Sequence, residues 1–334
     1  MPTRRRLLAT AGLVSLSLPA IAAAPEVAEL RYQGWAGQVL FPELAEDLGY
    51  LAPLKLKWVG NTISGPQDIQ TTVTRDVDFG GAFNGSILKL IAANAPIRAV
   101  IGFAGTDSQT WRGLYALEDS GIRGPRDLIG RKVGVNTLGA HYEFVIQEYL
   151  RRGGLTDAEI KQVTLVVLPP PNAEQTLRLE QIDAVVFEPI FRDRAVSRGG
   201  LHLLRSDFDL FGDFTTAAYV LTRPFLQRNP NAARAFVEGT ARAIDWAASH
   251  PREEVVARYR DIIRRRARTA EDDSAVAFWK STGLAGRGGV LADQHFGLFI
   301  DWFGRAGDAG IGRLKPADVL TNAFNPFRDE ARQG

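Results

Sequence analysis

Residues 132–152 read KVGVNTLGAHYEFVIQEYLRR, and the fold class can be inferred from them. Its first five residues, Lys132 to Asn136, form the short aliphatic run that is typical of a buried strand. A turn containing Gly139 follows, and from His141 to Arg152 the apolar residues recur at helical spacing. A strand that passes through a tight turn into a long helix is the repeating unit of α/β folds.

The same alternation continues on both sides of this stretch. Strands are predicted at 30–33, 54–59, 77–80 and 99–103, with helices at 40–48, 65–73 and 87–93, and later strands at 163–168, 184–187 and 217–221. Helices are predicted over most of 225–305, including 275–282. The pattern predicts two α/β lobes, each a mixed, mostly parallel sheet flanked by helices, with crossovers at 106–111 and 213–217 and a helical carboxyl-terminal segment.

Composition excludes several classes of function. The chain has 334 residues, 45% of them apolar, and its length suits about two domains. It has no Cys, which excludes disulfides, thiolate metal sites and cysteine nucleophiles. The net charge of +2 falls by three, to −1, without the arginines at positions 4–6. A nearly neutral surface indicates neither nucleic-acid nor anionic-lipid binding.

The amino terminus has the pattern of an export signal. Arg4-Arg5-Arg6 precedes an apolar run from Leu7 to Leu18, and small residues at A-x-A spacing follow at 20–24. We expect residues 1–22 to be a cleaved signal peptide; the paired arginines favour the twin-arginine route, and an ordinary secretory signal is the alternative. We therefore expect a periplasmic protein without a membrane anchor.

Known catalytic motifs are missing from the sequence. It contains no G-x-S-x-G, H-E-x-x-H, Walker A or G-x-G-x-x-G pattern, and its four His are scattered without metal-ligand spacing. The arginine-rich run at 252–268 has apolar residues at helical spacing, which predicts that its arginines lie on a solvated face. We predict neither an enzyme, nor a cofactor, nor a bound metal.

Polar segments containing glycine follow three predicted strands, at 33–38, 80–86 and 136–141. In open α/β sheets ligands bind beyond the carboxyl ends of the strands, and a helix amino terminus suits an oxyanion. The segment from Thr137 to His141 is the best candidate, because Gly139 permits close backbone approach and Thr137 can donate its hydroxyl. Each segment alone is also explained as a turn, but together they predict a ligand cleft with Trp35 and Phe83 as walls.

Two residues allow two interpretations. His141 either donates to the ligand or simply occupies the first turn of its helix. Glu188 either complements the amino terminus of the next helix or faces the cleft and pairs with a cationic group.

Several segments resemble the periplasmic solute-binding proteins of ABC importers for nitrate, taurine and aliphatic sulfonates. The resemblance extends from about residue 29 to residue 326. It rests on YQ at 32–33, DFGG at 78–81, DLIGRKVGV at 127–135, GAHY at 139–142, LPP at 168–170 and DAVVFEP at 183–189.

The resemblance implies a type II binding-protein fold with the ligand held between two lobes. Lobe one would hold residues 25–108 plus 217–334, and lobe two residues 109–216. By position, lobe one would line the cleft with Gln33, Gly81 and Asn84, and lobe two would hold an anionic head with Thr137, Gly139, Ala140 and His141. Trp35 and the Phe83–Asn84 pair depart from the family's pattern, and Glu188 would repel a plain alkanesulfonate.

The function that follows from the resemblance is capture of a small organic oxyanion, an aliphatic sulfonate or taurine, for an ABC permease and its ATPase. Glu188 would suit a zwitterion, whereas Trp35 and Phe83 would also accept a flat ring. The alternatives are therefore a receptor for a thiamine-precursor pyrimidine or another heteroaromatic nutrient, or a secreted enzyme with His141 as general base oriented by Glu188. A monomer is expected.

Overall fold

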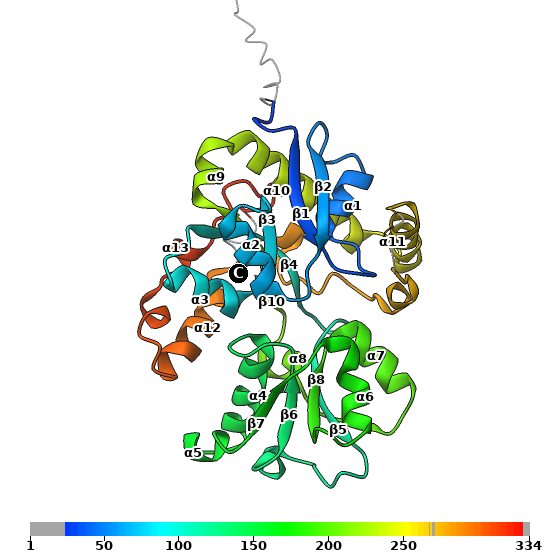
Figure 1. Ribbon diagram of the computed structural model, residues 1–334, viewed down its shortest axis with the longest axis vertical. Helices are drawn as coiled ribbons and strands as arrows, with labels where there is room; N and C mark the ends of the chain where they lie inside the picture. Colours follow the sequence, from blue (N-terminus) through cyan, green and yellow to red (C-terminus); the bar gives the residue numbers. More distant parts are fainter. Residues whose placement is uncertain (1–23, 267, 269–270, 330–334) are drawn as a thin grey trace, which may run out of the picture.

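The computed structural model describes residues 24–266, 268 and 271–329 as two α/β lobes stacked along the long axis of the molecule (Figure 1). The predicted signal peptide lies outside the described residues. Within those residues no helix is both long and apolar enough to cross a membrane. The residue boundaries of the lobes given above stay a prediction.

Lobe one contains two small sheets. β1 (Glu29–Gly34) pairs in parallel with β2 (Lys55–Asn61), and β10 (Phe214–Thr222) lies antiparallel between β3 (Phe79–Phe83) and β4 (Ile97–Thr106). The helices that precede β10 are α1 (Phe41–Asp47), α2 (Gly65–Thr74) and α3 (Asn84–Ala92); those that follow it are α9 (Arg223–Arg228), α10 (Pro230–Ser249), α11 (Arg252–Arg266), α12 (Asp293–Arg305) and α13 (Pro316–Val319).

Lobe two contains one five-stranded sheet in the order β7-β6-β8-β5-β9. Its strands are β5 (Gly113–Leu117), β6 (Lys132–Val135), β7 (Thr164–Val167), β8 (Ala184–Phe187) and β9 (Leu201–Ser206). Its helices are α4 (His141–Arg152), α5 (Asp157–Ile160), α6 (Ala173–Arg178), α7 (Pro189–Ser197) and α8 (Asp207–Phe211). β6 is parallel to β7 and β8, and β5 is antiparallel to β8 and β9, so the predicted mixed sheet is confirmed.

The two lobes also pack directly on each other through α4 and α12. The rings of Phe144 and Phe299 lie 4.6 Å apart. Trp302 Nε1 donates to Gln147 Oε1 at 2.9 Å. These contacts join the lobes in addition to the two chain crossings, and they involve the first two turns of α4.

The prediction that 80–83 form a loop is wrong, because these residues are the strand β3. A Cβ at Gly80 would lie 2.5 Å from the carbonyl oxygen of Asp68 in α2, and one at Gly81 would lie 2.7 Å from the Phe103 ring. The two glycines therefore let α2 approach one face of the strand and an aromatic ring approach the other. They serve close packing rather than turning.

Three other local predictions need correction. Strands β5 and β9 were not anticipated, since GLYAL and LHLLRS lack a clear strand period. The predicted helix at 275–282 is only a short 3-10 helix, Ser274–Phe278. In the arginine-rich run the side chains of Arg264 and Arg265 are exposed as predicted, but those of Arg266 and Arg268 are only 11% and 7% exposed.

Candidate functional site

The strand ends of the two lobes face one another. Phe83, the last residue of β3, stacks on His141, the first residue of α4, with ring centroids 5.5 Å apart and planes 27° apart. Helix α4 follows β6 in the chain. Strand β8 lies next to β6 in the same sheet. The carboxyl end of β3 in lobe one therefore meets the carboxyl end of the parallel strands β6 and β8 in lobe two, the end at which ligands bind in open α/β folds.

His141 is fully buried at this junction. Its Nε2 lies 2.8 Å from Asp207 Oδ2, and neither side chain is exposed. Burial lowers the pKa of His141, and Asp207 opposes this shift without reversing it. Burial alone would raise the pKa of Asp207, but His141 and Arg112 outweigh it and lower that pKa. The side chain that orients His141 is therefore Asp207, in place of the Glu188 that the enzyme alternative assumes.

Arg112, which the sequence did not single out, connects the two lobes. Its Nη1 donates to the carbonyl of Gly105 at the end of β4, at 3.0 Å. The same guanidinium lies 3.3 Å from Glu188 and 3.7 Å from Asp207, both in lobe two. It also stands over the Phe83 ring at 5.2 Å. Burial would lower the pKa of Arg112, but the two carboxylates raise it above its ordinary value.

Glu188 pairs with a cationic group, one part of the two interpretations that the sequence left open. It is the N-cap residue of α7, yet its side chain makes no capping hydrogen bond. Its carboxylate lies against Arg112 instead and is 25% exposed. The cationic partner of Glu188 is therefore a residue of the protein.

The loop after β6 carries the predicted oxyanion residues. Gly139 has a φ of +65°, a backbone conformation that favours glycine, and its N–H donates to Glu143 Oε2 at 2.6 Å. Lys89 of α3 reaches this loop, because a Cβ at Gly139 would lie 1.5 Å from Lys89 Nζ. Thr137 is half-buried and Ala140 is buried as the N-cap of α4. Lys89 brings a positive charge to the loop that sequence reasoning missed.

The Asn84 side chain is buried and hydrogen-bonded to β10 and α12. It is 0% exposed, and its Nδ2 donates to the carbonyls of Thr215 and His295 at 2.9 and 3.2 Å. The predicted contact of Asn84 with a ligand stays a prediction.

Gln33 and Gly81 are both bound to helix α2. Thr71 Oγ1 donates to Gln33 Oε1 at 3.3 Å, and the Gly81 N–H donates to Asp68 Oδ2 at 2.7 Å. Asp68 is only 3% exposed, and burial raises its pKa to about 7 although the Gly81 hydrogen bond lowers it. Asp68 is another residue that sequence reasoning missed.

We expect Asp68→Asn to stabilise the protein more at pH 8 than at pH 5. Because the folded-state pKa of Asp68 is about 7, above its ordinary 3.8, the folded state binds this proton more tightly and stability falls as pH rises between these values. Asparagine does not titrate, so this loss of stability with rising pH is absent from the variant. The gain in the free energy of unfolding from Asp68→Asn should therefore increase by roughly 2.5 kcal/mol from pH 5 to pH 8. Urea unfolding at both values measures it, with exposed Asp76→Asn as the control; equal gains at both pH values would contradict the burial argument.

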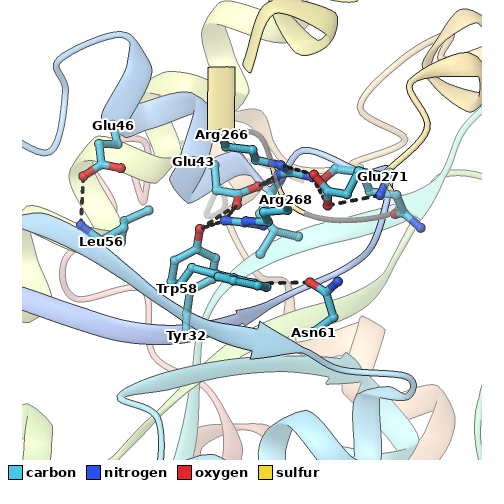
Figure 2. Close-up of polar contacts among 12 residues, drawn as sticks. Tyr32, Glu43, Glu46, Leu56, Trp58, Asn61, Arg266, Arg268 and Glu271 are labelled. Atoms are coloured by element: carbon cyan, nitrogen blue, oxygen red, sulfur yellow. Dashed lines mark hydrogen bonds and ion pairs between the residues drawn. The ribbon is translucent and has the colours of Figure 1, made fainter. Parts of the chain in front are cut away.

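The loop after β1 is fixed by a buried polar cluster (Figure 2). Arg268 Nη2 donates to Tyr32 Oη at 2.6 Å and to Glu43 Oε1 at 2.8 Å. Arg266 pairs with Glu43 and Glu271 at 2.8 and 2.7 Å and donates to the carbonyl of Gln38 at 2.8 Å. Beside the cluster lies a hollow of about 390 Å³ lined by Ile263, Arg264, Arg268, Glu271, Asp272 and Asp273.

Trp35 lies in the same loop after β1 and is half-buried against the core of lobe one. The predicted site residues thus fall into three groups. Phe83 and His141 stack on each other between the lobes, and the buried Asn84 and Ala140 are their neighbours in the chain, whereas Gln33, Trp35, Thr137 and Glu188 are partly exposed near the strand ends. Gly81 and Gly139 are buried backbone positions.

In the described part of the chain no group of His, Asp and Glu side chains is arranged to hold a metal ion.

Two α/β lobes whose strand ends face each other define the periplasmic-binding-protein fold. The alkanesulfonate-binding protein SsuA from Xanthomonas axonopodis pv. citri, solved bound to MOPS, superposes with a TM-score of 0.66, 20% identity and coverage of 90% of this chain and 99% of that one. The nitrate-binding protein NrtA from Synechocystis PCC 6803 gives a TM-score of 0.69, 14% identity and coverage of 93% and 90%.

The chain belongs to the NMT1/THI5-like family, whose model matches residues 44–254. A curated relative, the nitrate/nitrite binding protein NrtA of Nostoc sp. (strain PCC 7120), is 24% identical over 132 residues. That match covers 39% of this chain and 29% of the relative. The predicted family resemblance and two-lobed fold are confirmed.

Proposed function

We propose that this protein is the periplasmic solute-binding receptor of an ABC importer and captures a small organic oxyanion, an aliphatic sulfonate or taurine. The observation that carries the proposal is the meeting of strand ends from both lobes at the amino terminus of α4, a helix of 12 residues. The dipole and free N–H groups of such a terminus favour an anion. Lys89 adds a cation at the same loop.

Lobe closure supplies the mechanism. A ligand that contacts both lobes makes its full set of interactions only when they are close together, so it shifts the population toward the closed state. The closed receptor then presents its ligand to the permease. The similarity to sulfonate-binding and nitrate-binding proteins supports an oxyanion as the ligand.

A thermal-shift screen of the mature protein tests the proposal. The panel holds alkanesulfonates, taurine, nitrate, sulfate, carboxylates and pyrimidines. A ligand at one hundred times its Kd adds about 2.7 kcal/mol of stability, which raises Tm by a few degrees. Stabilisation by sulfonates supports the proposal, and stabilisation by pyrimidines alone favours the heteroaromatic alternative. Stabilisation by no sulfonate and no carboxylate contradicts an organic-oxyanion receptor.

Thr137→Ala should weaken binding of the best sulfonate from this screen. The substitution removes a hydroxyl donor to a charged group, which costs about 1.5–3 kcal/mol, or roughly 10-fold to 150-fold in Kd. Isothermal titration calorimetry measures the change. Thr164→Ala, at the exposed amino end of β7, is the matched control, and an unchanged Kd in Thr137→Ala would remove Thr137 from the site.

A further inference from the structure

The lobes touch on both sides of the molecule, and the two contacts differ in kind (Figure 1). On the left of the view α4 packs on α12, and on the right α7 packs beside the short 3-10 helix Ser274–Phe278. His141, the first residue of α4, is fully buried. A ligand therefore reaches the amino terminus of α4 only when the lobes move apart.

The contact of α4 with α12 is a shared apolar core. The Phe144 ring lies 4.6 Å from Phe299 and 5.4 Å from Trp302, and none of these three residues is more than 2% exposed. The His141 ring extends the cluster, 6.1 Å from Phe299 and stacked on Phe83. Separation of the lobes here would expose fully buried aromatic rings to water, which the hydrophobic effect strongly opposes.

The contact of α7 with lobe one contains a partly exposed ion pair. Lys280 Nζ lies 2.8 Å from Asp193 Oδ2, and these side chains are 42% and 17% exposed. The other Asp193 oxygen pairs with the buried Arg192 of the same helix at 2.7 Å. Ser281, next to Lys280, donates to Asp107 Oδ2 at 2.7 Å in the segment that joins β4 to β5. Water and salt readily replace an ion pair of this kind, so this contact separates at little cost.

Two of the partly exposed site residues lie on the α7 side. Glu188 is the N-cap of α7 and is 25% exposed. Trp35 lies in the loop after β1, whose Gly37 N–H donates to Glu271 Oε1 at 3.4 Å, just before the 3-10 helix. Separation of α7 from that helix would therefore move Glu188 away from the loop that carries Trp35.

Building on the proposed receptor function, we propose that the lobes open on one side only. They turn about the aromatic contact of α4 with α12, and the Lys280–Asp193 ion pair is the clasp that closes the α7 side. Lys280 and Asp193 are then positioning residues, because they determine how firmly the receptor holds its ligand without touching it.

Distances between spin labels test the direction of opening, since the chain has no cysteine and two can be introduced. Val196→Cys in α7 with Ala257→Cys in α11 spans the clasp side, and Ala158→Cys in α5 with Leu298→Cys in α12 spans the aromatic side. All four positions are exposed. In ligand-free protein, Lys280→Gln should increase severalfold the population with a longer 196–257 distance and leave the 158–298 distance unchanged. Pulsed electron–electron double resonance measures both distances.

Lys57→Gln is the matched control for the clasp variant. Lys57 forms an exposed ion pair with Glu29 at 3.1 Å within lobe one, so its loss should change neither distance. High salt should lengthen the 196–257 distance of the protein with native Lys280, because salt screens an exposed ion pair. An unchanged distance in high salt would contradict the clasp.

Taurine or propane-1-sulfonate should return the 196–257 distance of Lys280→Gln to the value seen with native Lys280, because a ligand that contacts both lobes favours the closed state. An equal increase of both distances, or an increase of the 158–298 distance alone, would overturn the pivot at α4 and α12. No change of either distance in Lys280→Gln would overturn the clasp. If the clasp side opens and neither sulfonate closes it, one-sided opening stands and the proposed ligand class fails.

Discussion

Arg112→Met should lower the free energy of unfolding by about 3–5 kcal/mol, the cost of leaving buried carboxylates without their cation. The Arg112 side chain is 4% exposed and lies against Glu188 and Asp207. Methionine fills a similar volume but offers no positive charge and no donor to the Gly105 carbonyl. Urea unfolding followed by circular dichroism measures the loss.

Arg126→Met is the matched control for this variant. The Arg126 side chain is 62% exposed and makes one ion pair with Glu159, so its loss should cost less than about 1 kcal/mol. A similarly small loss in Arg112→Met would show that the carboxylates find other partners, and it would remove Arg112 as the residue that joins the lobes.

Gly80→Ala should cost about 2–3 kcal/mol through crowding between β3 and α2. The added Cβ would lie 2.5 Å from the Asp68 carbonyl oxygen and 2.6 Å from Thr72 Oγ1. The strand has little room to move, because Gly80 pairs with Val220 in β10, so α2 must shift. That shift would also disturb the hydrogen bond from Gly81 to Asp68.

Gly297→Ala is the opposite case. Gly297 lies in helix α12, and its added Cβ would meet nothing within 4 Å, so alanine should stabilise by about 0.5–1 kcal/mol. Thermal and urea unfolding of both variants check the pair. Equal effects of the two substitutions would contradict the close packing of α2 on β3.

The sequence predicted the elements with strong local patterns. Helix α4 begins at His141 and ends at Arg152 as expected, and β8 covers the predicted 184–187, because a continuous apolar run or a helical period reports burial directly. The glycines at 80–81 were misread because Gly serves both turns and close packing, and only the partners in α2 and β10 distinguish the two.

The candidate site was harder to predict because its contacts are distant in sequence. The pairs His141–Asp207 and Arg112–Glu188 join residues more than 60 positions apart, and no local pattern links them. The helical period predicted that Arg266 and Arg268 lie in solvent. That period carries no information about Glu43, with which both buried side chains form ion pairs.

The place of β10 also bears on the order in which the chain can fold as it is synthesised. β10 lies between β3 and β4, yet it is made only after every strand of the five-stranded sheet, which ends at Ser206. A growing chain thus holds all strands of lobe two while the central strand of lobe one is still missing. Until residue 222 has been synthesised, β3 and β4 have no common neighbour. Their edges stay unpaired until β10, more than 100 residues further along the chain, has been made.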